Sequence, residues 1–327
     1  MEIGSFLELD IERTGEYFPD NENVARLNSA RAGIYHSLQV MQCDDIYVPY
    51  YQCPTVNSFL GKKGVKIYQY YLSNTFKPLL NRPENKSAIL IVNYFGIFSN
   101  EYFKNIQREF QNVIIDNGPA FYNPPIEGCF NVYSARKFFG VPDGCYVVGP
   151  NANDFTNEYS VDYSSPTAGF LFQRHEFGCS ASYKERMKNE ERIDNADVLR
   201  MSHLTRTLLG GINYQRIRNL RRNNFQYAHE QYKSVNLLNV SINYDDSCVP
   251  MFYPLVVEND SLVEELAKNQ IYTGRRWNSV LTEVKGDTFE AWLSRYMVPL
   301  PVDQRYGSSE LDKVFEAVFK ILGKGMA

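Results

Sequence analysis

The segment Ala88-Ile89-Leu90-Ile91-Val92 is a continuous apolar run in the first third of the chain. Strands whose two faces are both covered by helices have this composition, because neither face meets water. Shorter apolar segments lie on either side of it, separated by segments with apolar residues at helical spacing. This alternation predicts a mainly parallel sheet with helices on both faces, a three-layer α/β/α fold. The expected strands are 46–49, 65–71, 88–92, 113–115, 131–134 and 145–148, and the expected helices are 28–41, 55–63 and 101–110.

The character of the sequence changes after Pro150, where a polar stretch leads into segments rich in Arg, Asn and Glu. A Gly210-Gly211 pair interrupts the helical spacing of these segments. We therefore expect a large domain over 1–212 and a smaller C-terminal α+β domain over 213–327. The elements expected after Pro150 are a loop over 151–167, helical segments over 183–232, 262–269 and 311–322, and a strand over 249–257.

The composition is that of an ordinary globular protein. Of its 327 residues 44% are hydrophobic and 22% are charged, and the net charge is −4 with the basic residues spread along the chain. A nucleic-acid or membrane-surface partner is therefore not expected. No secretory signal is visible at the N-terminus, and no apolar run approaches ~18 residues, so we expect no membrane-spanning helix and a cytoplasmic protein. Six scattered cysteines suggest reduced thiols, and four isolated histidines argue against a metal site.

Small and polar residues open the first expected helix, in the order Asn28-Ser29-Ala30-Arg31. Small side chains let backbone N–H groups approach a phosphate, and the helix dipole favours its negative charge. An ordinary helix cap explains Asn28 and Ser29 as well.

Asp116 follows the apolar run Val113-Ile114-Ile115 and so stands at the exit of a buried strand. A carboxylate fixed beside a pyridine nitrogen favours the protonated form of that nitrogen and raises its pKa. The alternative is that Asp116 caps the turn that follows the strand.

Lys137 comes three residues after Ser134, which ends another expected strand, and aromatic residues and a Gly/Pro turn follow it. An amine that is partly shielded from water is more readily neutral, and a neutral amine can form an imine. The pattern predicts such shielding by the neighbouring aromatic residues. The alternative is a solvated lysine on the surface.

The order of these three motifs resembles that in fold type I enzymes that use pyridoxal 5′-phosphate. More narrowly, the chain resembles the DegT/DnrJ/EryC1/StrS family of nucleotide-sugar aminotransferases. Further segments are similar to family motifs. These are Ser29-Ala30-Arg31-Ala32-Gly33, Pro49-Tyr50-Tyr51-Gln52-Cys53, Val92-Asn93-Tyr94-Phe95-Gly96, Arg200-Met201-Ser202-His203-Leu204 and Leu300-Pro301.

The resemblance implies an aspartate-aminotransferase-like fold, a homodimer, and pyridoxal 5′-phosphate held as a Schiff base on Lys137. It implies that Asp116 contacts the ring nitrogen and that an amino group passes, with glutamate as donor, to a nucleotide-linked keto sugar in surface-polysaccharide synthesis. The stretch Thr273-Gly274-Arg275-Arg276-Trp277, with Arg275 and Trp277 as the substrate-binding candidates, could clamp a carboxylate or diphosphate, although a solvated basic turn packed by Trp277 explains it equally well. The implied cofactor contacts are Ser29, Ala30, Arg31, Cys53, Asn93, Asp116, Ser134 and Lys137.

The chain departs from the family pattern at four places. Pro119 stands where the family has Gln or His, and Ser134 lies closer to the lysine than the family's phosphate-binding Ser does. Cys53 stands where the family has an aromatic residue that stacks on the ring, so that either a nearby Tyr replaces it or the stacking is weaker, and Val198 stands where it has an Asn, with Asn195 as a candidate replacement. Two other interpretations stay open. One is a different pyridoxal-phosphate enzyme of the same fold type, such as a decarboxylase or aldolase, and the other is a non-catalytic binding protein that kept the fold.

Overall fold

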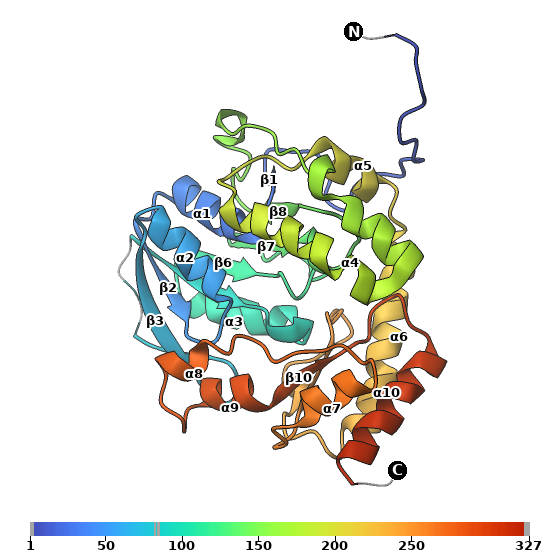
Figure 1. The fold of residues 1–327 in the computed structure, drawn as a ribbon. Helices are drawn as coiled ribbons and strands as arrows, with labels where there is room; N and C mark the ends of the chain where they lie inside the picture. The colour runs from blue at the N-terminus through green and yellow to red at the C-terminus, as the bar shows by residue number, and fades with distance from the viewer. Residues whose placement is uncertain (1–2, 82, 84–85, 324–327) are drawn as a thin grey trace.

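A computed structural model describes residues 3–81, 83 and 86–323 of the chain. Its centre is an eight-stranded sheet with the strand order β1-β8-β7-β6-β5-β2-β3-β4 (Figure 1). The strands are β1 (Val24–Leu27), β2 (Asp45–Pro49), β3 (Lys66–Leu72), β4 (Pro78–Leu79), β5 (Ser87–Val92), β6 (Val113–Asp116), β7 (Phe130–Ser134) and β8 (Cys145–Val148).

Parallel pairing dominates the sheet, as the sequence predicts. Strands β3, β2, β5, β6 and β7 pair in parallel, whereas β8 is antiparallel to both β7 and β1. Because two reversals cancel, β1 runs in the same direction as β7. The carboxyl ends of β1, β2, β5, β6 and β7 therefore lie along one edge of the sheet. Ligands bind at this edge in open parallel sheets.

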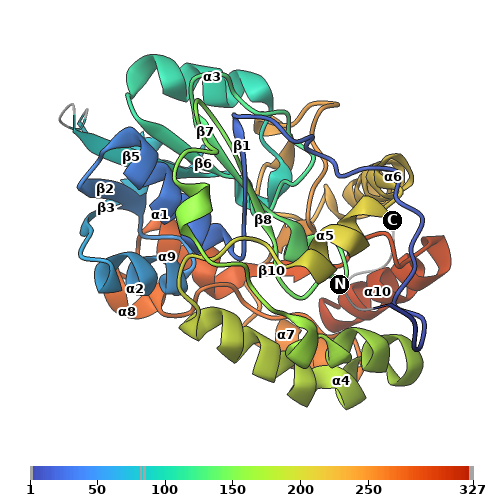
Figure 2. The same cartoon turned by 90° about the horizontal axis from the view of Figure 1, so that it is seen from above.

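Alternate residues of the central strand β5 pack into two separate cores. Ile89 and Ile91 face the core that contains α3 (Asn100–Glu109), whereas Ala88 and Leu90 face the core that contains α1 (Ala30–Met41) and α2 (Pro54–Lys62). Figure 2 shows α3 on one side of the sheet, opposite α1 and α2. The three-layer α/β/α prediction is confirmed.

A two-stranded antiparallel sheet of β9 and β10 forms a second, smaller structure after the large sheet. Helices α6, α7 and α10 pack around it (Figure 1). The predicted domain boundary between 212 and 213 falls in the short link before α6, and the division into two domains stays a prediction. The elements are α4 (Gly169–Asn195), α5 (His203–Gly210), α6 (Tyr214–Tyr232), β9 (Tyr253–Val256), α7 (Leu262–Lys268), α8 (Val280–Glu283), α9 (Phe289–Tyr296), β10 (Met297–Leu300) and α10 (Ser308–Ile321).

Three findings concern disulfide bonds, metal ions and membrane-spanning helices. All six cysteines are free. Within 3–81, 83 and 86–323, no cluster of three or more His, Cys, Asp or Glu side chains could hold a metal ion. Over the same residues, none of the helices combines the length and apolarity needed to cross a lipid bilayer.

Candidate active site

The predicted site residues after β5, β6 and β7 lie side by side at the carboxyl edge of the sheet. The Asn93 N–H donates to the Asp116 carbonyl (3.0 Å), and the Asn117 N–H donates to the Val132 carbonyl (2.8 Å). The Asn93 side chain also donates to Asn117 Oδ1 (2.8 Å). These bonds continue the parallel pairing just past the strand ends, so they fix Asp116 between its two neighbouring strands.

Asp116 and Lys137 face one small space beside Gly118. A Cβ atom added to Gly118 would lie 2.8 Å from Asp116 Oδ1 and 2.9 Å from Lys137 Nζ. The same carboxylate oxygen accepts a hydrogen bond from the Gly118 N–H (2.8 Å). Lys137 forms no ion pair within the described ranges, so its amine is near Asp116 but not locked to it. The structure thus brings the two predicted catalytic residues together.

The surroundings of Lys137 differ from the prediction. Its side chain is exposed, whereas Phe138 and Phe139 pack into a core with Phe121 and Tyr122. The cause is the short 3-10 turn Ala135–Lys137, which directs the two phenylalanines inward and the lysine outward. The prediction that these aromatic residues shield the amine is therefore wrong.

The buried thiol of Cys145 is close to both catalytic candidates. Burial raises the pKa of Cys145, the negative charge of Asp116 raises it further, and the positive charge of Lys137 lowers it. Cys145 begins β8 and pairs with both Leu27 and Ser134. This strand therefore connects the start of α1 with the lysine turn.

The start of α1 is held against the lysine turn by backbone hydrogen bonds. The Gly144 N–H donates to the Asn28 carbonyl (2.9 Å), and the Ala135 N–H donates to the Gly144 carbonyl (3.1 Å). Ser29 caps the helix by accepting from the Ala32 N–H (3.3 Å). In the described part of the chain, the N–H groups of Ala30 and Arg31 and the Ser134 hydroxyl have no acceptor or donor. Two helix-start donors and one hydroxyl are therefore available to an anion.

Arg31 itself is used elsewhere. Its side chain is buried and pairs with Asp194 of α4 (2.5 Å). Arg136, next to Lys137, pairs in the same way with Glu190 of α4 (2.5 Å). Only the main chain of Arg31 can serve a phosphate, and the two ion pairs dock α4 against the site.

The two remaining predicted cofactor contacts, Asn93 and Cys53, lie at the same edge of the sheet but differ in their surroundings. Asn93 is fully buried, and its amide oxygen has no partner in the described structure. Cys53 precedes α2 with its Sγ 3.1 Å from the Thr55 hydroxyl. Tyr50 packs on Tyr71 (4.6 Å between ring centroids) and Tyr51 is enclosed in the core. Neither Tyr50 nor Tyr51 therefore replaces the aromatic residue that the family has at the position of Cys53.

The two predicted substrate residues have different positions. Arg275 donates to the backbone carbonyls of Asn259 (2.8 Å) and Asp260 (3.2 Å). Trp277 packs edge-on against Tyr51 (4.6 Å) at the end of β2. Arg276 belongs to the same predicted stretch but was not one of its two selected residues; it lies between them and has no carboxylate partner among the described residues. The sequence alone does not tell which of two adjacent arginines finds hydrogen-bond acceptors.

Sequence reasoning also missed Asp143, a fully buried carboxylate in the turn after Lys137. It accepts from the Ser202 N–H (2.8 Å), the Ser202 hydroxyl (2.7 Å) and the Thr205 hydroxyl. Ser202 is the cap of α5 and belongs to the Arg-Met-Ser segment. Asp143 therefore anchors the lysine turn to α5.

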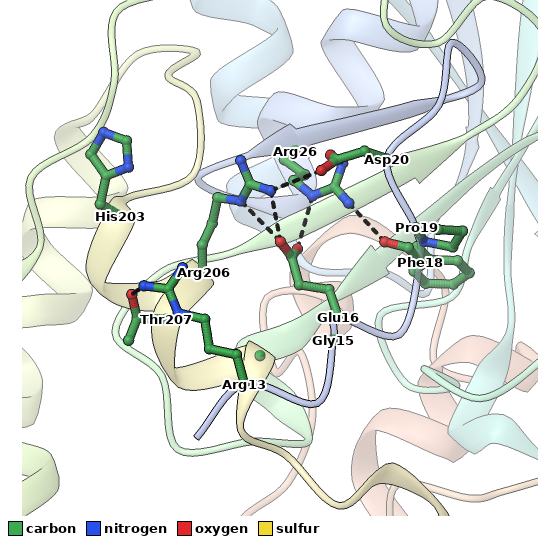
Figure 3. A pocket seen from close by; sticks show the side chains of 11 residues that line it. Arg13, Gly15, Glu16, Phe18, Pro19, Asp20, Arg26, His203, Arg206 and Thr207 are labelled. Atoms are coloured by element: carbon green, nitrogen blue, oxygen red, sulfur yellow. Dashed lines mark hydrogen bonds and ion pairs between the residues drawn. The ribbon is translucent and has the colours of Figure 1, made fainter. Parts of the chain in front are cut away.

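A separate hollow lies beside the N-terminal segment (Figure 3). Most of its charged groups are already paired, because Glu16 accepts from Arg26 (2.8 Å) and from Arg206 (2.9 Å) and Arg26 also pairs with Asp20. None of the predicted site residues lines it. Its lining consists of Arg13, Gly15, Glu16, Phe18, Pro19, Asp20, Arg26, His203, Arg206, Thr207 and Gly210.

No protein-family model matches the chain, and no curated protein matches it by sequence. Solved structures do match it. A DegT DnrJ EryC1 StrS aminotransferase from Brucella abortus is 14% identical with a TM-score of 0.62, over 92% of this chain and 86% of that one. The sugar aminotransferase CalS13 from Micromonospora echinospora is 15% identical with a TM-score of 0.59, over 91% and 87%. The chain has the fold of the sugar aminotransferases.

A third protein with this sugar aminotransferase fold is Spr1654 from Streptococcus pneumoniae. It is 13% identical with a TM-score of 0.62, over 91% of this chain and 87% of that one, in a structure of its PMP-form. A PLP-form of the same protein has a TM-score of 0.61. The predicted fold class, a fold type I α/β protein, is confirmed, and the family resemblance seen in the sequence extends to the fold of nearly the whole chain.

Proposed function

We propose that the protein is a pyridoxal-phosphate-dependent aminotransferase that acts on a sugar. The observation that carries this proposal is the shared space of Lys137 and Asp116 beside Gly118. The amine and the carboxylate flank a gap at the carboxyl edge of the sheet, where ligands bind. There the amine would bind the aldehyde carbon of the cofactor, and the carboxylate would contact the nitrogen of its pyridine ring. The neighbouring structures in PLP-form and PMP-form support the same cofactor.

The other residues at this edge fit the parts of the cofactor. The free N–H groups of Ala30 and Arg31 and the Ser134 hydroxyl would hold the phosphate. Asp116 would hold the ring nitrogen in its protonated form, because an adjacent negative charge favours it. Asn93, whose buried amide oxygen has no partner in the described structure, would contact the ring. A cofactor that supplied this partner would remove the cost of a buried unsatisfied oxygen.

When bound, pyridoxal phosphate supplies an electron sink for the substrate carbon that carries the amino group. Lys137 would hold the cofactor covalently and, once displaced by an amino substrate, would accept the proton of that carbon and return it. Two features suit Lys137 to these roles. Its amine is exposed to entering substrate, and over residues 3–81, 83 and 86–323 it has no carboxylate in an ion pair.

The substrates and assembly in this proposal follow from the family resemblance. Glutamate is the donor, and the acceptor is a keto sugar on a nucleotide that is used in surface-polysaccharide synthesis. The enzyme is a cytoplasmic homodimer. Exposed apolar side chains along α4, which include Phe172 (65% exposed) and Phe177 (69% exposed), support a second copy packing there.

A half-reaction tests amino transfer directly. Protein loaded with pyridoxal phosphate is mixed with glutamate, and the ~420 nm absorbance of the cofactor is followed. We expect conversion to the amine form, with release of 2-oxoglutarate, and its reversal by one member of a panel of nucleotide keto sugars. A loaded protein that converts with neither glutamate nor any other amino acid would exclude the aminotransferase and leave the other enzymes of this fold type.

A further inference from the structure

Arg276 is a half-buried cation. Its Nε atom is enclosed and has no hydrogen-bond partner in the described part of the chain, and its guanidinium carbon lies 5.1 Å from the centre of the Phe252 ring. No ion pair of Arg276 exists within the described residues. Burial lowers its pKa. A cation that is partly withdrawn from water and has no counter-ion costs the fold stability, so its presence points to a ligand that pairs with it.

Tyr51 presents a second unsatisfied group beside Arg276. Its side chain is fully buried, and its hydroxyl has no partner in the described structure. Trp277, the next residue after Arg276, packs on the Tyr51 ring (4.6 Å), and the positive charge of Arg276 opposes the rise that burial causes in the pKa of Tyr51. Tyr51 follows β2 at the carboxyl edge of the sheet, so Arg276 reaches this edge from the C-terminal part of the chain.

We propose that Arg276 and Tyr51 bind a carboxylate of the amino donor, an inference that rests on the proposed function. A guanidinium presents two parallel N–H donors that match the two oxygens of a carboxylate. The Tyr51 hydroxyl adds a third donor. One positive charge matches one carboxylate, whereas the diphosphate of a nucleotide sugar carries more charge than this pair can neutralise.

The position of the pair relative to the cofactor residues supports the donor. Cys53, at the position where the family places a residue over the ring, is close enough to Arg276 to raise its pKa. Arg186 of α4 is close enough to lower the same pKa. Arg186 also lies 3.8 Å from Glu190, and Glu190 pairs with Arg136, the neighbour of Lys137. The carboxylate site therefore borders the cofactor site through both β2 and α4.

The backbone around Arg276 is held in a fixed, strained shape. Trp277 has a φ of 54°, which is unfavourable for a residue with a side chain. The Ser294 hydroxyl donates to the carbonyls of Arg276 (3.3 Å) and Trp277 (3.1 Å), and the Trp277 ring packs on Tyr51. These contacts orient the guanidinium before a ligand arrives, which lowers the entropic cost of binding.

A binding experiment without cofactor isolates this site. Trp292→Phe leaves Trp277 as the single tryptophan, and its fluorescence is followed while glutarate, a dicarboxylate without an amino group, is added. We expect a saturable change with glutarate and none with dimethyl glutarate. Arg276→Gln weakens glutarate binding about 10- to 100-fold, whereas the matched control Arg275→Gln leaves it unchanged. Equal glutarate binding by Arg276→Gln and the parent would overturn the proposal, and so would binding of UDP in place of glutarate.

The loaded protein separates this inference from the proposed function. We expect Arg276→Lys and Arg276→Gln to keep the ~420 nm band while the KM for glutamate in the half-reaction rises about 10- to 100-fold, with Tyr51→Phe showing a smaller rise. Absence of the band in the parent protein contradicts the proposed function. A normal band together with an unchanged KM for glutamate in Arg276→Gln contradicts the carboxylate site alone.

Discussion

Lys137 Nζ and Asp116 Oδ1 lie 2.9 Å and 2.8 Å from the single point that a Cβ atom would occupy on Gly118. Two strands and two turns meet there, because Asp116 ends β6 while Lys137 follows β7. Glycine is needed at this position for space rather than for backbone conformation, since its φ is not positive. The gap that it leaves is the feature on which the cofactor assignment depends.

Gly118→Ala fills this gap. We expect the added methyl group to displace the Lys137 amine or the Asp116 carboxylate and to slow the glutamate half-reaction by ~10²-fold, with little change in Tm because the backbone conformation tolerates alanine. Gly61→Ala is the matched control, since its Cβ would meet no atom within 4 Å. Stopped-flow absorbance measures the rate. Full activity of Gly118→Ala would show that the gap is not used.

Asp116→Asn removes the charge and keeps a hydrogen-bond acceptor for the Gly118 N–H. We expect the variant to bind the cofactor and keep its visible band. Without a carboxylate beside it, the ring nitrogen loses its proton more readily, so the half-reaction slows by about 10²- to 10⁴-fold. The band and the rate are measured on the same sample. A rate equal to that of the parent protein would remove Asp116 from the mechanism.

Arg276→Met separates a functional residue from a structural one. Methionine fills the space without an unpaired charge, so we expect the Tm of the cofactor-free protein to stay equal or to rise by about 1–4 °C. Differential scanning calorimetry provides the measurement. A large fall in Tm would mean that Arg276 stabilises the fold, and its assignment to the donor carboxylate would lose its main support.

His36 gives the fold a dependence on pH. It is fully buried between the Ala152 carbonyl (2.7 Å) and the Tyr159 hydroxyl (3.0 Å), and burial lowers its pKa below the ordinary value of 6.5. The unfolded chain therefore binds a proton that the folded chain excludes. We expect the free energy of unfolding to be fully retained above pH 6.5 and to fall as the pH decreases below it.

Urea unfolding between pH 5 and pH 8 measures this effect. The decrease should be smaller in His36→Gln than in the exposed-site control His175→Gln. Identical pH profiles of the two variants would contradict the assignment to His36.

The sequence was most informative where one local pattern determines one structure. The uninterrupted apolar runs at β5 and β6 predict buried strands, because only strands covered on both faces lack polar residues. β1 was missed because Arg26 interrupts its four residues, and its charge is neutralised by Glu16 from the segment that precedes the strand. β10 was missed because Pro299 disfavours a strand, which a two-stranded sheet with free edges tolerates.

The same contrast holds for the site. Asp116 and Lys137 could be selected from sequence because each follows a strand end, and parallel strands bring such ends together. The exposure of Lys137 could not be predicted from sequence, since it depends on how the turn Ala135–Lys137 directs successive side chains. Arg276 could not be ranked above Arg275 either, because two adjacent arginines look alike in sequence, whereas in the structure Arg275 donates to two backbone carbonyls and the Nε of Arg276 has no partner among the described residues.

Covalent trapping with borohydride tests the central claim most directly. The protein is incubated with pyridoxal phosphate, the ~420 nm band is recorded, and borohydride then fixes any imine before peptide mass mapping. We predict that the cofactor is found on the peptide that contains Lys137, and that Lys137→Ala lacks both the band and the label while the exposed-lysine control Lys104→Ala keeps them. A label on another lysine, or an unchanged band in Lys137→Ala, would contradict the account.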